Sequence, residues 1–174
     1  MNKVVFWGAL TLCFWLSSVA NAQDESGLNV SFADSSWDGV KVPAGQHCKM
    51  FDGNGSSPEL LVENIPTGAN ALIVSFSDRS FRPNDNGGHG IIGQWVEAGQ
   101  SSAIVASVAG ETNTMPEGMF IEAKFRSNRG SDGAYLPPCS GGRGNEYYAT
   151  VSAVKKDQNE TQVLAETTIE MGRY

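Results

Sequence analysis

Histidine and cysteine are scarce in this sequence, whose 174 residues include only two histidines, His47 and His89, and three cysteines. His47 adjoins Cys48, and imidazole and thiolate are both zinc ligands. Neither residue, however, has further ligands at the paired spacing of a zinc site. We therefore expect neither a metal nor another cofactor.

Basic residues are also few. Twelve Lys and Arg stand against 19 Asp and Glu, which gives a net charge of −7. This balance disfavours phosphate backbones and anionic membrane surfaces as partners. Lys124, Arg126 and Arg129 form a small basic cluster of the kind that usually makes a solvated face. We expect no nucleic-acid partner.

The apolar run at the start is too short for a membrane span. Residues 4–19 follow Lys3 and end at Ala20-Asn21-Ala22, whereas a spanning helix needs roughly 20 apolar residues. A positive start, an apolar run and a small-x-small site are the three parts of a secretory signal peptide. We expect residues 1–22 to be removed, leaving a single periplasmic or secreted domain of residues 23–174 without a membrane anchor. The mature chain would carry a net charge of −8, because only Lys3 is lost.

After that cleavage only Cys48 and Cys139 remain, in a compartment where disulfides form. A bridge between them would close a long loop and stabilise the domain by about 4 kcal/mol in the chain-entropy model. Two buried free thiols are the alternative.

Sustained helical periodicity is absent from the mature chain. Short apolar runs are separated instead by Gly, Pro, Asn and Asp, which is typical of strands and turns. Residues 71–77 form a continuous apolar run, the mark of a central strand covered on both faces. Residues 147–154 alternate, as do 163–171, with Val163 placed on the same side as Met171; the polar stretch 155–161 suits a hairpin loop. Further strands are expected near residues 28–32, 91–96, 103–109 and 119–125, and a short extended segment at 40–43. The prediction is an all-β-dominated fold, an antiparallel β-sandwich with little helix.

Three polar loops rich in Gly and Pro are candidates for a site, provided that the fold brings them together. They span residues 52–60, 78–90 and 135–147.

The order of these motifs resembles the phosphatidylethanolamine-binding protein (PEBP) family, in its exported bacterial branch of Raf-kinase-inhibitor-like proteins. The resemblance covers residues 38–174. It rests on Asp38-Gly39 before an extended Pro segment, the Gly55-Ser56-Ser57-Pro58-Glu59-Leu60 stretch, the core strand ending in Asp78, Gly88-His89, and the Pro137-Pro138-Cys139 loop before the strand that begins at Tyr147.

The resemblance implies a PEBP-like sandwich with a small anion-binding pocket at one end. It further implies that the pocket is lined by Asp78, His89, Pro137, Pro138 and Tyr147. An imidazole, a phenol and backbone N–H groups in turns can all donate to phosphate or carboxylate oxygens. The expected ligand is a small anion or a phosphorylated headgroup.

The chain departs from the family at three pocket positions. Ser80 stands where the family has a second Asp, Asn145 where it has a second His, and Gly90 where a Trp commonly follows the first histidine. The departures put the family's ligand preferences in doubt for this chain.

Each candidate side chain also has an ordinary structural interpretation. His89 could be a turn histidine bonded to backbone, Asp78 could cap a turn, and Tyr147 could be a core aromatic with a bonded hydroxyl. Cys139 near His89 would make a thiol–imidazole pair, but a disulfide is the more natural state of that thiol. We therefore expect no enzyme.

Two functions from different classes remain. The first is a non-catalytic binding protein that uses the pocket. The alternative is an interaction or protease-inhibitor-like protein whose pocket is vestigial, with loops 79–86 and 126–132 as the contact surface.

Overall fold

The structure is a computed structural model that describes Met1 and residues 27–126 and 132–174. The expected signal peptide and its cleavage site lie in the remaining N-terminal residues, outside the described part. Among the described residues, no helix is long and apolar enough to cross a membrane.

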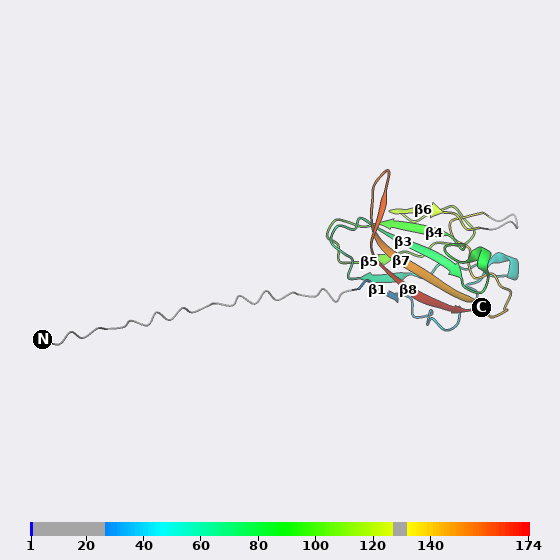
Figure 1. Cartoon of the computed structure of the whole chain (residues 1–174). Helices are drawn as coiled ribbons and strands as arrows, with labels where there is room; N and C mark the ends of the chain where they lie inside the picture. Colours follow the sequence, from blue (N-terminus) through cyan, green and yellow to red (C-terminus); the bar gives the residue numbers. More distant parts are fainter. Residues whose placement is uncertain (2–26, 127–131) are drawn as a thin grey trace.

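Two antiparallel sheets make up the fold (Figure 1). The larger has the strand order β6 (Met119–Ala123), β4 (Ile91–Trp95), β3 (Ala71–Asp78), β7 (Glu146–Lys156) and β8 (Thr161–Arg173). The smaller has the order β1 (Asn29–Phe32), β2 (Leu60–Glu63) and β5 (Ser102–Val105). Helical structure in the described residues is limited to two single 3-10 turns, η1 (Lys49–Phe51) and η2 (Arg82–Asn84). The expected β-rich sandwich is therefore confirmed.

One hydrophobic core joins the two sheets. Strand β7 shows why, because every second residue of its first half is apolar and fully or almost fully buried: Tyr147, Ala149, Val151 and Ala153. This face of the larger sheet packs on Leu60 and Val62 of β2 and on Val105 of β5. The period-two pattern thus fixes which face of β7 meets the smaller sheet.

Strand β3 is central in the larger sheet, as its continuous apolar run predicts. It pairs with β4 on one side and with β7 on the other. Leu72 and Val74 belong to the core between the sheets, whereas Ala71 and Ile73 are covered on the opposite face by Phe120 of β6.

The hairpin of β7 and β8 is present, with a shorter loop (residues 157–160) than expected. The prediction for Val163 is wrong, because this side chain is 53% exposed while Met171 is buried. Ala153 pairs with Ala165 but Val154 pairs with Val163, so Leu164 is an extra residue at a β-bulge. A one-residue shift turns the side chains beyond it to the other face.

Cys48 and Cys139 form a disulfide across a sequence separation of 91 residues. The alternative of two free thiols is thereby excluded. The bridge joins the segment before η1 to the loop that precedes β7.

Candidate functional site

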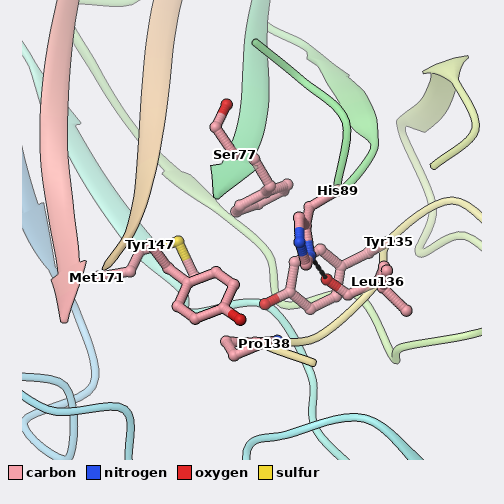
Figure 2. A pocket seen from close by; sticks show the side chains of 8 residues that line it. Ser77, His89, Tyr135, Leu136, Pro138, Tyr147 and Met171 are labelled. Atoms are coloured by element: carbon pink, nitrogen blue, oxygen red, sulfur yellow. Dashed lines mark hydrogen bonds between the residues drawn. The ribbon is translucent and has the colours of Figure 1, made fainter. Parts of the chain in front are cut away.

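His89 and Tyr147 come together at one end of the sandwich, with their rings edge to face and their centroids 5.3 Å apart (Figure 2). Tyr147 begins the buried face of β7, directly opposite Asp78 at the end of β3. His89 lies just before β4, and its backbone N–H donates to the carbonyl of Phe76 in β3. Antiparallel pairing of three neighbouring strands therefore gathers residues that are far apart in the sequence.

Gly90 allows the third loop to approach His89. Its φ of +108° is in the region that favours glycine, and a Cβ there would lie 2.0 Å from the carbonyl oxygen of Ala134. The close approach lets the Leu136 N–H donate to the His89 carbonyl at 2.8 Å. Glycine at this position thus has a steric reason.

The His89 ring is buried and bonded on both sides. Nδ1 lies 2.7 Å from the carbonyl oxygen of Leu136, a contact in which only a protonated Nδ1 can donate. Nε2 then accepts a longer contact of 3.4 Å from the amide of Asn84 in η2. Burial lowers the pKa of His89, although the Leu136 carbonyl and the Asp78 carboxylate oppose the shift. The ring is therefore neutral near pH 7.

The hydroxyl of Tyr147 also has protein partners. It accepts a hydrogen bond of 3.1 Å from the backbone N–H of Cys139. Burial, reinforced by the nearby Asp78 carboxylate, raises the pKa of Tyr147 to about 12. This phenol stays protonated, and its hydroxyl is already engaged by the Cys139 N–H and by the side chains of Ser140 and Asp78.

The Asp78 carboxylate is buried and accepts hydrogen bonds from two neighbouring residues. One carboxylate oxygen accepts from the Ser80 N–H at 2.9 Å, which is the turn cap considered above, and the other accepts from the Asn145 side-chain amide at 2.7 Å. Asn145 therefore bonds the carboxylate.

A small hollow lies between these groups, with about 140 Å³ of space between its lining atoms but nowhere wide enough for a water molecule. Its walls come from β3, β7, β8 and the two loops (Figure 2): Phe76, Ser77, His89, Tyr135, Leu136, Pro138, Tyr147 and Met171. Of the residues predicted to line a pocket, His89, Pro138 and Tyr147 do so.

The other two predicted residues lie outside this lining. Asp78 pairs with Tyr147 across the two strands and interacts with its hydroxyl, but it is not among the residues that line the hollow. Pro137 packs in the opposite direction, so close to Gly55 and Gly110 that a Cβ on either glycine would lie within 3 Å of its ring. The first polar loop thus supports the Pro-Pro segment from behind, while the second and third loops meet at the hollow.

Tyr135 is the site residue that the sequence did not single out. It is completely buried, and its hydroxyl has no hydrogen-bond partner among the described residues. Figure 2 shows this hydroxyl and that of Tyr147 pointing to the same side of the hollow, next to Pro138. An unpaired buried hydroxyl costs about 1–3 kcal/mol and calls for an explanation.

The disulfide braces the wall opposite His89. Cys139 supplies the N–H that bonds Tyr147, and the N–H of Cys48 donates to the Pro138 carbonyl at 3.1 Å. The bridge therefore holds two lining residues in place.

The surroundings of His47, the other histidine, are not those of a metal ligand. Its Nε2 lies 2.9 Å from the Phe51 carbonyl oxygen, its ring stacks on Tyr174, and the neighbouring Cys48 is in the disulfide. Within residues 27–126 and 132–174, no three His, Cys, Asp or Glu side chains gather as a metal site would need.

A second, larger depression lies on the other face of the same strand ends. This charged groove has about 580 Å³ of space measured in the same way and is lined by Gly39, Val40, Arg79, Glu146, Glu170, Gly172 and Arg173. Arg79 makes a two-pronged pair with Glu170 at 2.7 and 2.9 Å, and Arg173 pairs with Glu146. Its charges neutralise one another.

Comparisons with known proteins show the fold. No family model and no curated protein matches this chain. Among solved structures, the PEBP homolog CT736 of Chlamydia trachomatis matches with a TM-score of 0.51 and 18% identity, over 85% of this chain and 97% of that one. YbcL of Escherichia coli, a member of the mammalian PEBP family, matches with a TM-score of 0.57 and 15% identity, over 86% and 98%. The chain therefore has a PEBP-like fold, as the motif order implied.

Proposed function

We propose that this chain is a non-catalytic, extracytoplasmic binding protein that holds a small oxygen-bearing anion, of the carboxylate or phosphate type, in the hollow around His89, Tyr135 and Tyr147. The two PEBP-like neighbours support a binding protein of this fold. The choice of site rests on the residues that follow.

The observation that carries the proposal is the unpaired hydroxyl of Tyr135. A phenol buried without a partner destabilises the folded protein, and such local conflicts are expected mainly where a protein has a function to perform. A ligand oxygen between the hydroxyls of Tyr135 and Tyr147 would remove the conflict. Because the hollow does not admit water as it stands, entry of the ligand requires an outward movement of one wall.

A role without catalysis agrees with the chemistry of the lining. Cys139, the nearest candidate nucleophile in the sequence, is bonded to Cys48. The Ser77 hydroxyl accepts a hydrogen bond from the Gly87 N–H, and burial keeps both tyrosines protonated. These groups can bind and orient a ligand, and none is an activated nucleophile.

An extracytoplasmic location is supported by two independent features. The N-terminal pattern is that of a signal peptide. The Cys48–Cys139 bridge is of a kind that persists in oxidising compartments.

Calorimetric titration of the purified protein with acetate, inorganic phosphate and phosphoethanolamine tests the proposal. At least one of them should bind, and His89→Ala should weaken that binding by removing a wall of the hollow. Absence of binding by all three at millimolar concentration would refute a ligand site here.

The alternative of a protein-interaction module with a vestigial pocket is favoured by a different observation. The hollow is too narrow for a water molecule, and His89, Asp78 and Tyr147 all bond to the protein itself. The rim loop that contains η2 carries Phe81, which is half exposed. In this case Phe81→Ser would abolish capture of a partner from periplasmic or culture fluid, whereas Tyr135→Phe would leave capture unchanged.

A further inference from the structure

The lining of the hollow offers hydrogen bonds without offering positive charge. Among its eight residues there is neither Lys nor Arg, and His89 is held neutral with Nδ1–H directed at the Leu136 carbonyl. The polar groups that remain are the free hydroxyl of Tyr135, the Tyr147 hydroxyl, which already bonds the Cys139 N–H and the side chains of Ser140 and Asp78, and Ser77, whose hydroxyl is bonded to the Gly87 N–H.

Two cations on the flanking segments, Arg79 and Arg126, are directed away from the hollow. Arg79 pairs with Glu170 on the outer face and lies over the Tyr148 ring, 4.5 Å from its centroid. Arg126 donates to the backbone carbonyls of Asp85 and Asn86. The charged group that acts on the hydroxyl of Tyr147 is instead the carboxylate of Asp78, which carries the same sign as an anionic ligand.

We infer that this hollow selects an uncharged or singly charged oxygen group, such as a carboxamide, a carboxylate or a singly ionised phosphate, and excludes a phosphate dianion. The inference rests on the proposed function and specifies its ligand class. The phenol hydroxyl of Tyr135 can donate to a ligand oxygen without a counter-charge. A second negative charge in a buried site without a cation, and close to Asp78, faces both desolvation and repulsion.

A phosphate monoester tests this selectivity because its charge changes near neutral pH. Methyl phosphate is mainly a monoanion at about pH 5.5 and a dianion at about pH 8, since the second pKa of a phosphate monoester is about 6. Acetate is the matched control, because it remains mostly a monoanion over the same range. Both ligands are titrated into the purified protein at the two pH values.

The expected result is a methyl phosphate affinity that is on the order of tenfold or more higher at the lower pH, while acetate affinity changes by less than about threefold. Acetamide should bind at both pH values. Tyr135→Phe should weaken acetate binding by about tenfold, whereas Tyr148→Phe should not, because the Tyr148 hydroxyl bonds Asp85 outside the hollow.

Failure of the inference and failure of the proposed function would give different results. Equal binding of methyl phosphate at both pH values would show that the hollow accepts a dianion, and the inference would be wrong while the proposed function stood. An equal increase in the affinities for acetate and methyl phosphate at the lower pH would show that the added proton is on the protein. That result would also overturn the inference. No binding of any of the three ligands would refute the proposed function itself.

Discussion

The narrow hollow and the charged groove are formed by neighbouring residues of the same strands, yet they are opposite in character. Tyr147 and Met171 face the hollow, whereas the adjacent Glu146 and Glu170 face the groove. The groove is the larger of the two, but its charged side chains pair with one another and are about a third to two-thirds exposed. The hollow is small and buried, and one of its hydroxyls has no partner. Unmet hydrogen-bonding capacity, rather than size, is therefore our reason for proposing the hollow as the binding site.

The largest effect that separates the two regions should come from the disulfide, which bonds residues that line the hollow and none that line the groove. Replacing both Cys48 and Cys139 by Ala should lower the free energy of unfolding by about 4 kcal/mol, because a long loop in the unfolded chain is released. Urea unfolding of the variant and of the oxidised wild-type protein measures this. The variant should also lose ligand binding while the Arg79–Glu170 pair persists; unchanged binding would show that the bridge does not organise the hollow.

Gly90→Ala should have the next largest effect, about 2–4 kcal/mol of destabilisation. Its new Cβ would meet the Ala134 carbonyl in a backbone conformation that suits only glycine. Gly99→Ala is the matched control, because Gly99 also has a positive φ but has nothing within 4 Å of its position for a Cβ. If thermal or urea unfolding showed the same loss of stability for both variants, the close approach at His89 would contribute nothing to the effect of Gly90→Ala.

Acidification should weaken the fold through His89 before it affects the groove. The folded state keeps His89 neutral with a lowered pKa, whereas the unfolded chain takes up the proton below about pH 6.5. More protons on the unfolded chain mean that stability falls as the pH falls, by up to about 1.4 kcal/mol per pH unit until the folded-state pKa is reached. His89→Gln should lack this component, so parallel pH profiles of unfolding for the two proteins would contradict a neutral buried ring.

The smallest effect is expected in the groove. Glu170→Gln breaks the pair with Arg79, but both side chains are about half exposed. Solvent screens such pairs, so the free energy of unfolding should change by less than about 1 kcal/mol, and less still at high salt. A decrease of several kcal/mol in the free energy of chemical unfolding would show that the groove contributes strongly to stability. The hollow and the groove would then not differ in this respect.

Much of the fold can be predicted from the period-two alternation of apolar and polar residues in the sequence. The alternation of Tyr147, Ala149, Val151 and Ala153 correctly predicts the buried face of β7, and the apolar run of β3 predicts its central place. The exposure of Val163 cannot be predicted in this way, because the position of a bulge depends on both of the paired strands. Strand β2 was not predicted, since Leu60–Glu63 is only four residues long and shows no clear alternation.

The site was less accessible from the sequence. The motif order directs attention to His89, Pro138 and Tyr147, and these do line the hollow. Tyr135 lies in a polar loop, and no local pattern distinguishes a tyrosine whose hydroxyl is bonded from one whose hydroxyl is not. That distinction depends on Pro138, Tyr147 and Phe76, which surround it only in the folded chain.

The most direct test is the stability of Tyr135→Phe, measured by urea unfolding with and without saturating acetate. If the hydroxyl is unpaired and kept for a ligand, the variant without acetate should be as stable as the wild type or more stable, by about 1–3 kcal/mol at most, and should gain little from acetate. A variant that is less stable without ligand, yet is stabilised by acetate as much as the wild type, would show that Tyr135 bonds within the protein and takes no part in binding.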